Sequence, residues 1–318
     1  MKNLILSVGL VAVSLPLWAG EAIDSRLSAD GINKLTLIVP RGEVTLTGGD
    51  HREIRVQGEL DDQAREWVFE RDGSTLVAEV KMPSNWRDKG DGSTLTVTLP
   101  RSVEVEGSGV STDFSVSELQ RGLELESVSG DLKIIRVSGE VDADSVSGDI
   151  TADTLNGDIE LETVSGDILA EGLEGKVSAE SVSGEVSLSR AGGQLEVESV
   201  SGDIRLQLSR VQALEVTSVS GDIRVEMEAV ADAARLAFET VNGDARLALP
   251  ADASARFQLE TGPGGEIHNR LSAHQPERGE YVPTESLRFS QGDGRARVAM
   301  KTINGALTLS PVVGGHLK

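Results

Sequence analysis

The chain contains no cysteine among its 318 residues. It therefore has no disulfide, no thiolate metal site, no cysteine nucleophile and no cysteine for lipid attachment. Aromatic residues are scarce, with five Phe, three Trp and one Tyr, and 35 glycines favour many turns around a thin core. Positive charge is in deficit, because 30 Lys and Arg face 52 Asp and Glu, for a net charge of −22. This balance excludes a nucleic-acid binder that relies on phosphate contacts.

Long apolar runs are absent except at the N-terminus. A short basic start precedes a 16-residue run from Leu4 to Ala19, interrupted only by small residues and Pro16. The run is shorter than the roughly 20 residues of a membrane span and is typical of a signal peptide. We expect residues 1–19 to be a signal peptide cleaved near Ala19 to Ala22, with an uncleaved anchor as the alternative. The mature chain would be exported, to the periplasm or to the cell surface and beyond, and would keep no membrane span.

An internal repeat dominates the rest of the chain. Glycine recurs every nine residues from Gly130 to Gly202, in units such as VSGDITADT and LNGDIELET. Columns one, five and seven of the unit are apolar, while columns four, six and eight are mostly polar or charged. The alternation over columns four to eight predicts a short strand with one buried face, and the glycine marks the turn between strands.

A second period of 18 residues lies on the first. VSGD or VSGE begins at positions 128, 146, 164, 182 and 200, and again at 219, while the intervening units vary more. The pattern predicts an all-β fold, a parallel β-solenoid (β-helix) with about 18 residues per coil, built from nine-residue half-repeats that bury six apolar side chains per coil. A sandwich of hairpins is the alternative. The period-2 pattern excludes a helical repeat.

The repeat also divides the chain. Residues 20–106 form strand-like runs such as GEVTLTGGD and TLTVTLP, which we expect to be an N-terminal β region and cap. Residues 107–265 should be the regular solenoid. After Gly202 the glycine steps lengthen to 19 and then 22 residues, and residues 266–318 should be decorated C-terminal coils and a cap.

The VSGD units, the opening GEVTLTGGD, the LTVTLP strand and the closing TINGALTL together resemble the bacterial putative-adhesin family of β-strand-repeat proteins, a family of unknown biochemical function. The resemblance covers about residues 34–310. Its motifs are structural, so it implies a non-enzymatic envelope protein and carries over no catalytic residue.

Catalytic constellations are missing from the sequence. The four histidines lack metal-site spacing, and VSGD is not the GxSxG elbow of serine hydrolases. A glycan-active β-helix enzyme would normally show aromatic residues along a groove, which the repeat columns do not provide. We therefore predict no catalytic residue, no cofactor and no enzymatic activity.

The acidic fourth column is the one chemical feature of the repeat. It holds Asp131, Asp149, Asp167, Glu185, Asp203, Asp222 and Asp244. Stacked carboxylates could cap the turns through bonds to backbone N–H groups. Alternatively, they could bind calcium loosely, since oxygen ligands suit a hard cation. The weak metal candidates are Asp131, Asp149, Asp167, Asp203 and Asp222.

Trp86 lies in a loop rich in Pro, Gly and charge, beside Arg87 and Lys89. It either folds back over the first coil or stacks on a sugar ring or a protein partner. The sequence as a whole predicts a non-enzymatic, exported, adhesin-like binding or scaffold module of the bacterial envelope, with an unidentified protein or glycan partner. A periplasmic accessory protein of an envelope-stress or signalling system, and a glycan-active enzyme, are the alternatives.

Overall fold

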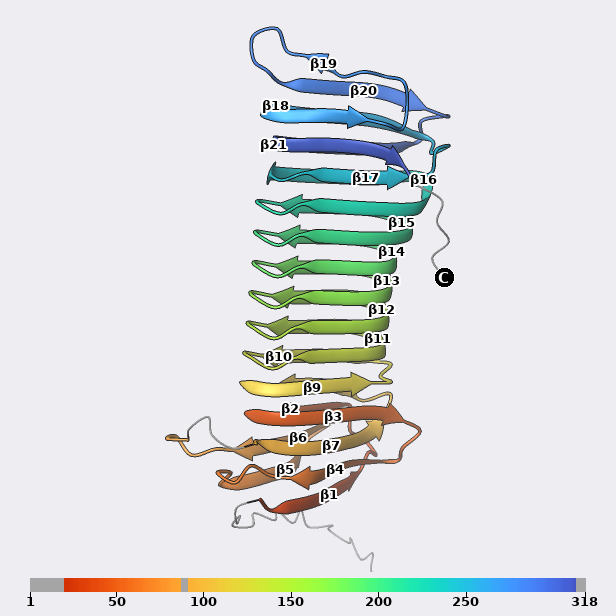
Figure 1. Cartoon of the computed structure of the whole chain (residues 1–318). Helices are drawn as coiled ribbons and strands as arrows, with labels where there is room; N and C mark the ends of the chain where they lie inside the picture. Colours follow the sequence, from red (N-terminus) through yellow and green to blue (C-terminus); the bar gives the residue numbers. More distant parts are fainter. Residues whose placement is uncertain (1–19, 87–90, 313–318) are drawn as a thin grey trace, which may run out of the picture.

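A computed structural model describes residues 20–86 and 91–312, which form 21 strands and no helix. The strands join in one continuous ladder that winds into an elongated stack of coils (Figure 1). The predicted all-β parallel solenoid is confirmed. The signal peptide predicted over residues 1–19 lies outside the described residues.

The central strands are the most regular part of the stack. Each pairs in parallel with the next at a spacing of 18 residues, so that Leu132 lies beside Ile150, and Ile150 beside Ile168. Parallel pairing in this register confirms the 18-residue period and excludes a hairpin sandwich here. These strands are β11 Leu132–Ser145, β12 Ile150–Thr163, β13 Ile168–Ser181, β14 Val186–Ser199, β15 Ile204–Ser218 and β16 Ile223–Asn242.

Each central strand bends at a corner and covers two faces of the coil. In β12 the bend follows Thr154, whose φ of 59° is in the left-handed region, and includes Gly157 with a φ of 142°. The VSGD turn then closes the coil. At Gly148 a side chain is excluded by space, because an added Cβ would overlap the carbonyl oxygen of Gly130 in the preceding coil. Glycine is thus required at both corners, as the repeat predicted.

The interior contains five apolar side chains per coil rather than six. In the β12 coil Ile150, Ala152, Leu155, Ile159 and Leu161 are buried. Residues in the first column of the nine-residue unit fall into two groups that differ in burial. Those in the variable half-repeat are buried, but the valines of VSGD are exposed, with Val146 and Val164 each at 45%. The expectation that the whole first column is buried was wrong, because a serine or threonine occupies the inward position just before each of these valines.

The N-terminal strands do not stack in chain order. β2 pairs in parallel with both β6 and β8, and β3 with both β7 and β9. The expected boundary at residue 107 therefore does not coincide with a break in the ladder. Antiparallel strands β1, β4 and β5 cover this end. The bounds are β1 Ala22–Ser28, β2 Lys34–Ile38, β3 Arg41–Gly49, β4 Glu53–Glu59, β5 Glu66–Asp72, β6 Thr75–Lys81, β7 Ser93–Pro100, β8 Glu104–Ser108, β9 Ser111–Ser117 and β10 Gly122–Ser127.

At the C-terminal end, too, strands stack out of chain order and an antiparallel strand covers the last coil. The last strand, β21, lies between β16 and β17 on one side and β18 on the other (Figure 1). Strand β20 then covers β18 in antiparallel pairing. The last strand in the sequence is therefore not the last strand of the ladder. The bounds are β17 Ala245–Leu249, β18 Ala255–Asn269, β19 Glu277–Arg278, β20 Glu285–Gln291 and β21 Ala296–Pro311.

Candidate functional site

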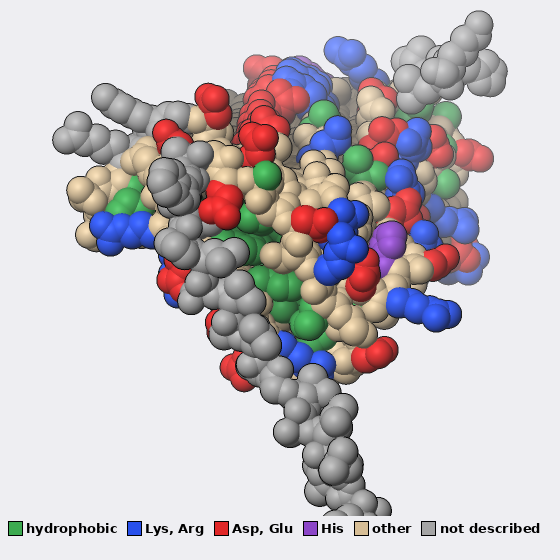
Figure 2. Space-filling model, turned by 90° about the horizontal axis from the view of Figure 1, so that it is seen from below, with side chains coloured by type: hydrophobic (Ala, Val, Ile, Leu, Met, Phe, Trp, Pro, Cys, Tyr) green, Lys and Arg blue, Asp and Glu red, His purple; other side chains and the backbone are tan. Residues whose placement is uncertain are grey.

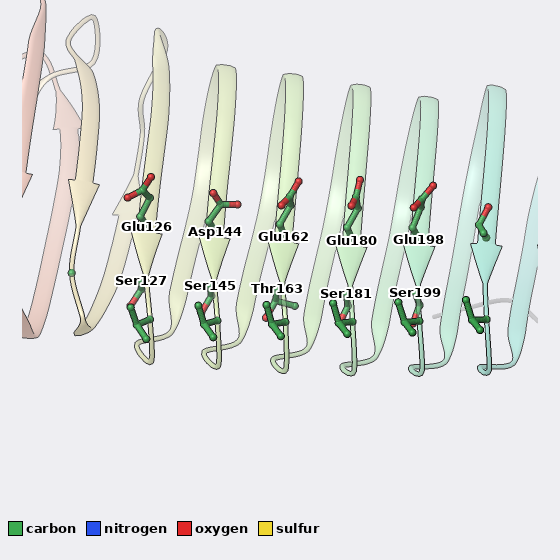
Figure 3. A pocket seen from close by; sticks show the side chains of 18 residues that line it. Glu126, Ser127, Asp144, Ser145, Glu162, Thr163, Glu180, Ser181, Glu198 and Ser199 are labelled. Atoms are coloured by element: carbon green, nitrogen blue, oxygen red, sulfur yellow. The ribbon is translucent and has the colours of Figure 1, made fainter.

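A groove of about 540 Å³ runs across the central coils, next to the VSGD corner. Three residues from each coil build it, so each coil adds the same set of side chains (Figure 3). The acidic row comprises Glu126, Asp144, Glu162, Glu180 and Glu198. The hydroxyl row comprises Ser127, Ser145, Thr163, Ser181 and Ser199, and the valine row comprises Val128, Val146, Val164, Val182 and Val200.

The hydroxyl row explains why the valines face solvent. Strand alternation turns Ser145 inward, and its Oγ accepts a hydrogen bond from the backbone N–H of Gly148 at 2.8 Å. The same bond forms between Thr163 and Gly166 at 3.0 Å. With the serine or threonine inside, the next residue must point outward. The result is a ladder of half-exposed valines, one per coil, about 4.8 Å apart along the axis.

The acidic row lies beside a second carboxylate column on the same face, which includes Glu124, Asp142, Glu160 and Glu196. Burial, reinforced by the charge of Asp144 and its neighbours, raises the pKa of Asp142 to about 6. Burial and then the charge of Asp144 raise the pKa of Glu162 to about 7. Among the described residues, no Lys, Arg or His side chain forms an ion pair with Asp142 or Glu162. This acidic face is therefore short of cations.

The predicted Asp column lies at the other end of the VSGD turn, and its residues stack as expected. One oxygen of Asp131 accepts the backbone N–H of Asp149 at 2.9 Å, and Asp149 accepts that of Asp167 at 2.8 Å. The same bond joins Asp203 to Asp222, and Asp222 to Asp244, at 3.0 Å each. The aspartates of the column thus cap the next coil, whereas the carboxylate of Glu185 contacts Arg205.

Arginines complete this column in the later coils. Arg224 contacts the carboxylates of Asp203 and Asp222, at 3.5 and 3.0 Å. Arg246 contacts those of Asp222 and Asp244, at 3.5 and 2.5 Å. Seen along the axis, the molecule shows acidic side chains stacked one behind another with basic ones beside them (Figure 2). Among residues 20–86 and 91–312 no group of three or more His, Asp or Glu side chains has the geometry to hold a metal. Loose calcium binding stays a prediction.

Trp86 is partly buried, and the ring lies under the guanidinium of Arg41 at 5.7 Å from its centroid. Arg41 begins β3 and is itself buried in an ion pair with Asp61. The arrangement therefore packs Trp86 against the first turns of the ladder. Its neighbours Arg87 and Lys89 lie outside the described residues. A ligand-binding role for Trp86 stays a prediction.

The exposed valine row and the hydroxyl row were not predicted from the sequence. A signal for them was present, since the residue before VSGD is serine or threonine in every copy: Ser127, Ser145, Thr163, Ser181, Ser199 and Ser218. A polar residue that recurs at an inward position implies a structural bond there. That bond in turn places the valine outside.

The chain is similar to several proteins of known structure. Solved structures that the chain resembles include a "putative adhesin" from Bacteroides fragilis, 12% identical over 91% of this chain and 97% of that one, with a TM-score of 0.44. A "putative lipid binding protein" from Parabacteroides distasonis is 14% identical over 92% of this chain and 98% of that one, with a TM-score of 0.41. No curated protein matches the chain.

Within residues 20–86 and 91–312 there is no helix that is long and apolar enough to cross a membrane. The family model of Toastrack DUF4097 matches residues 32–227 and 191–310, nearly the whole described ladder. This match confirms the resemblance first suggested by the VSGD and TINGALTL motifs. The chain belongs to the Toastrack DUF4097 family.

Proposed function

We propose that the protein is an exported, non-enzymatic, adhesin-like binding module of the bacterial envelope. The observation that carries the proposal is the groove, in which one half-exposed valine and one carboxylate recur coil after coil. A repeated pair of side chains provides a long contact surface. An enzyme site would instead need a unique set of residues in distinct roles.

The chemistry of the groove favours a partner that is basic and partly apolar. Covering one half-exposed valine contributes about 1 kcal/mol, so three neighbouring coils contribute about 3 kcal/mol. Carboxylates about 5 Å apart in water repel one another by about 0.8 kcal/mol per pair. A cation beside them relieves this repulsion. A basic protein surface therefore fits better than a neutral glycan, and a second copy of this chain would bring two acidic rows together.

The proposal is tested by measuring how purified protein binds to isolated cell-envelope fractions. In the variant Val146→Ser/Val164→Ser/Val182→Ser we expect binding to weaken by about tenfold or more, since the apolar wall is lost. The matched control is Leu169→Ser, because Leu169 is 57% exposed but lies in the first half of β13, outside the groove. It should bind like the wild type. Equal binding by the triple variant and the wild type would rule out the groove as the binding surface.

A further inference from the structure

The charge of the acidic face reverses at the C-terminal end of the rod. Arg235 of β16 lies beside Arg297 of β21, and Arg297 lies beside Arg256 of β18. The three side chains are exposed and occupy equivalent positions on adjacent strands, about 4.8 Å apart. In the central coils the same column holds Glu140, Asp158, Lys176 and Gln194. The column thus changes from acidic to basic along the axis.

These three arginines lack carboxylate partners within the described residues, although the chain has 52 acidic residues. Other arginines in this part of the rod are paired, because Arg224 of β16 and Arg246 of β17 each contact two aspartates. Like charges at neighbouring positions of a sheet are destabilising. A stack of three guanidinium groups without counter-charges is therefore unfavourable in the free protein and is relieved by a bound anion.

A hollow of about 540 Å³ adjoins the stack. Its lining includes Arg256 and Arg297 of the stack and Arg288 of β20. The rest of the lining is uncharged and comprises Phe257, Gln258, Phe289, Ser290, Val298 and Ala299. The guanidinium of Arg288 is paired with the carboxylate of Glu260 at 2.6 Å, so Arg256 and Arg297 are the lining arginines whose charge has no carboxylate partner among the described residues. The hollow is open to solvent and lies on a different part of the rod from the valine groove.

We propose that this hollow binds a ligand that carries two or more closely spaced phosphate or sulfate groups. Guanidinium groups donate paired hydrogen bonds to such oxyanions, and they do so better than lysine because their planar fork matches the oxygens. A stack of arginines at one strand spacing can contact neighbouring oxyanions of one ligand at the same time. The net charge of −22 repels anions elsewhere and so makes this site selective.

The test uses the mature full-length chain and inorganic tripolyphosphate, titrated calorimetrically at low salt. In Arg256→Gln/Arg297→Gln we expect binding to weaken by about tenfold or more, and added salt to weaken wild-type binding. The control, Arg136→Gln/Arg190→Gln, removes the same charge from corners of the central coils, where each arginine is paired with a glutamate. It should stay within about twofold of the wild type. Melting curves verify that both variants fold.

A second arm separates a soluble ligand from a lipid headgroup. Wild-type protein is sedimented with phosphatidylglycerol vesicles and with phosphatidylcholine vesicles. Binding to the anionic vesicles that tripolyphosphate displaces supports a headgroup ligand, whereas calorimetric binding alone supports a soluble one. Equal affinity of the Arg256→Gln/Arg297→Gln variant and the wild type, or an equal loss in the control, would overturn the proposal. So would the absence of binding in both arms.

Discussion

At the residue scale, two glycines of the same coil differ in how strictly the fold requires them. At Gly166 the limit is space, since an added Cβ would overlap the carbonyl oxygen of Gly148. At Gly172 the limit is conformation, since its φ is 69° while the atoms nearest to an added Cβ, in Thr154, are 3.6 Å away. The equivalent residues Arg136, Thr154 and Arg190 adopt the same left-handed conformation with side chains. The second position therefore tolerates a side chain, and the first does not.

We expect Gly172→Ala to lower the free energy of unfolding by about 1 kcal/mol, the cost of a left-handed conformation. Gly166→Ala should lower it by more than about 4 kcal/mol, because the backbone of two coils must shift. Chemical denaturation of the two variants and the wild type measures both effects. Similar losses in the two variants would contradict this division of roles.

The sequence predicted these residues unevenly. The nine-residue spacing identifies Gly166, because a turn that stacks on itself needs glycine in every copy, but Gly172 is not part of that series. It did not show that Val146 and Val164 face solvent, because an apolar residue next to a strand is assigned to the core by default. The bond between Ser145 and Gly148 decides their direction, and it is a local contact that periodicity does not report.

At the scale of elements, the second halves of β11 to β14 form the acidic face, on which burial raises the pKa of Asp142, Asp144, Glu162 and Glu180. In an unfolded chain these groups titrate near pH 4, but in the folded protein Asp142 titrates at about 6 and Glu162 at about 7. Between these values the folded state keeps protons that the unfolded state has released. Stability from these groups is therefore complete below about pH 4 and is lost as the pH rises through about 7.

The melting temperature should accordingly be higher at about pH 5.5 than at about pH 8. Groups with lowered pKa, such as Asp61 and Glu106, lose their contribution only at lower pH and do not reverse the trend in this window. Asp142→Asn/Glu162→Gln should flatten the pH dependence and raise the melting temperature at pH 8. The control Glu228→Gln, an exposed carboxylate outside this face, should leave the slope unchanged. An unchanged slope in the double variant would refute the assignment.

The inserted strand β21 gives a second test at this scale. Leu307 is fully buried between β17 and β18, whereas Ile303 of the same strand is 46% exposed. We expect Leu307→Ala to cost about 2 to 5 kcal/mol of unfolding free energy, as in the middle of a core, and Ile303→Ala less than about 0.5 kcal/mol. Denaturant titration measures both. A cost below about 1 kcal/mol for Leu307→Ala would show that β21 is a peripheral strand.

At the scale of the whole molecule, the sequence predicted the solenoid but not the order of its coils. Where successive coils of the chain are also neighbours in space, as in β11 to β15, the 18-residue period predicts which residues stack. It carries no information where a coil is inserted, since Lys34 pairs with Glu104 and Arg235 with Arg297 across long stretches of chain. The charge reversal on the acidic face arises from the same insertion, because β21 brings Arg297 between Arg235 and Arg256. The basic hollow was therefore not predictable from the repeat.

The proposed role of the whole molecule, an exported binding module of the envelope, depends first on where the protein lies in the cell. The most direct test is cell fractionation combined with protease added to intact cells. We predict a mature chain that begins near residues 20 to 23 and is found in the periplasmic or surface fraction. Full-length protein that retains residues 1–19 and remains in the cytosol would contradict the account.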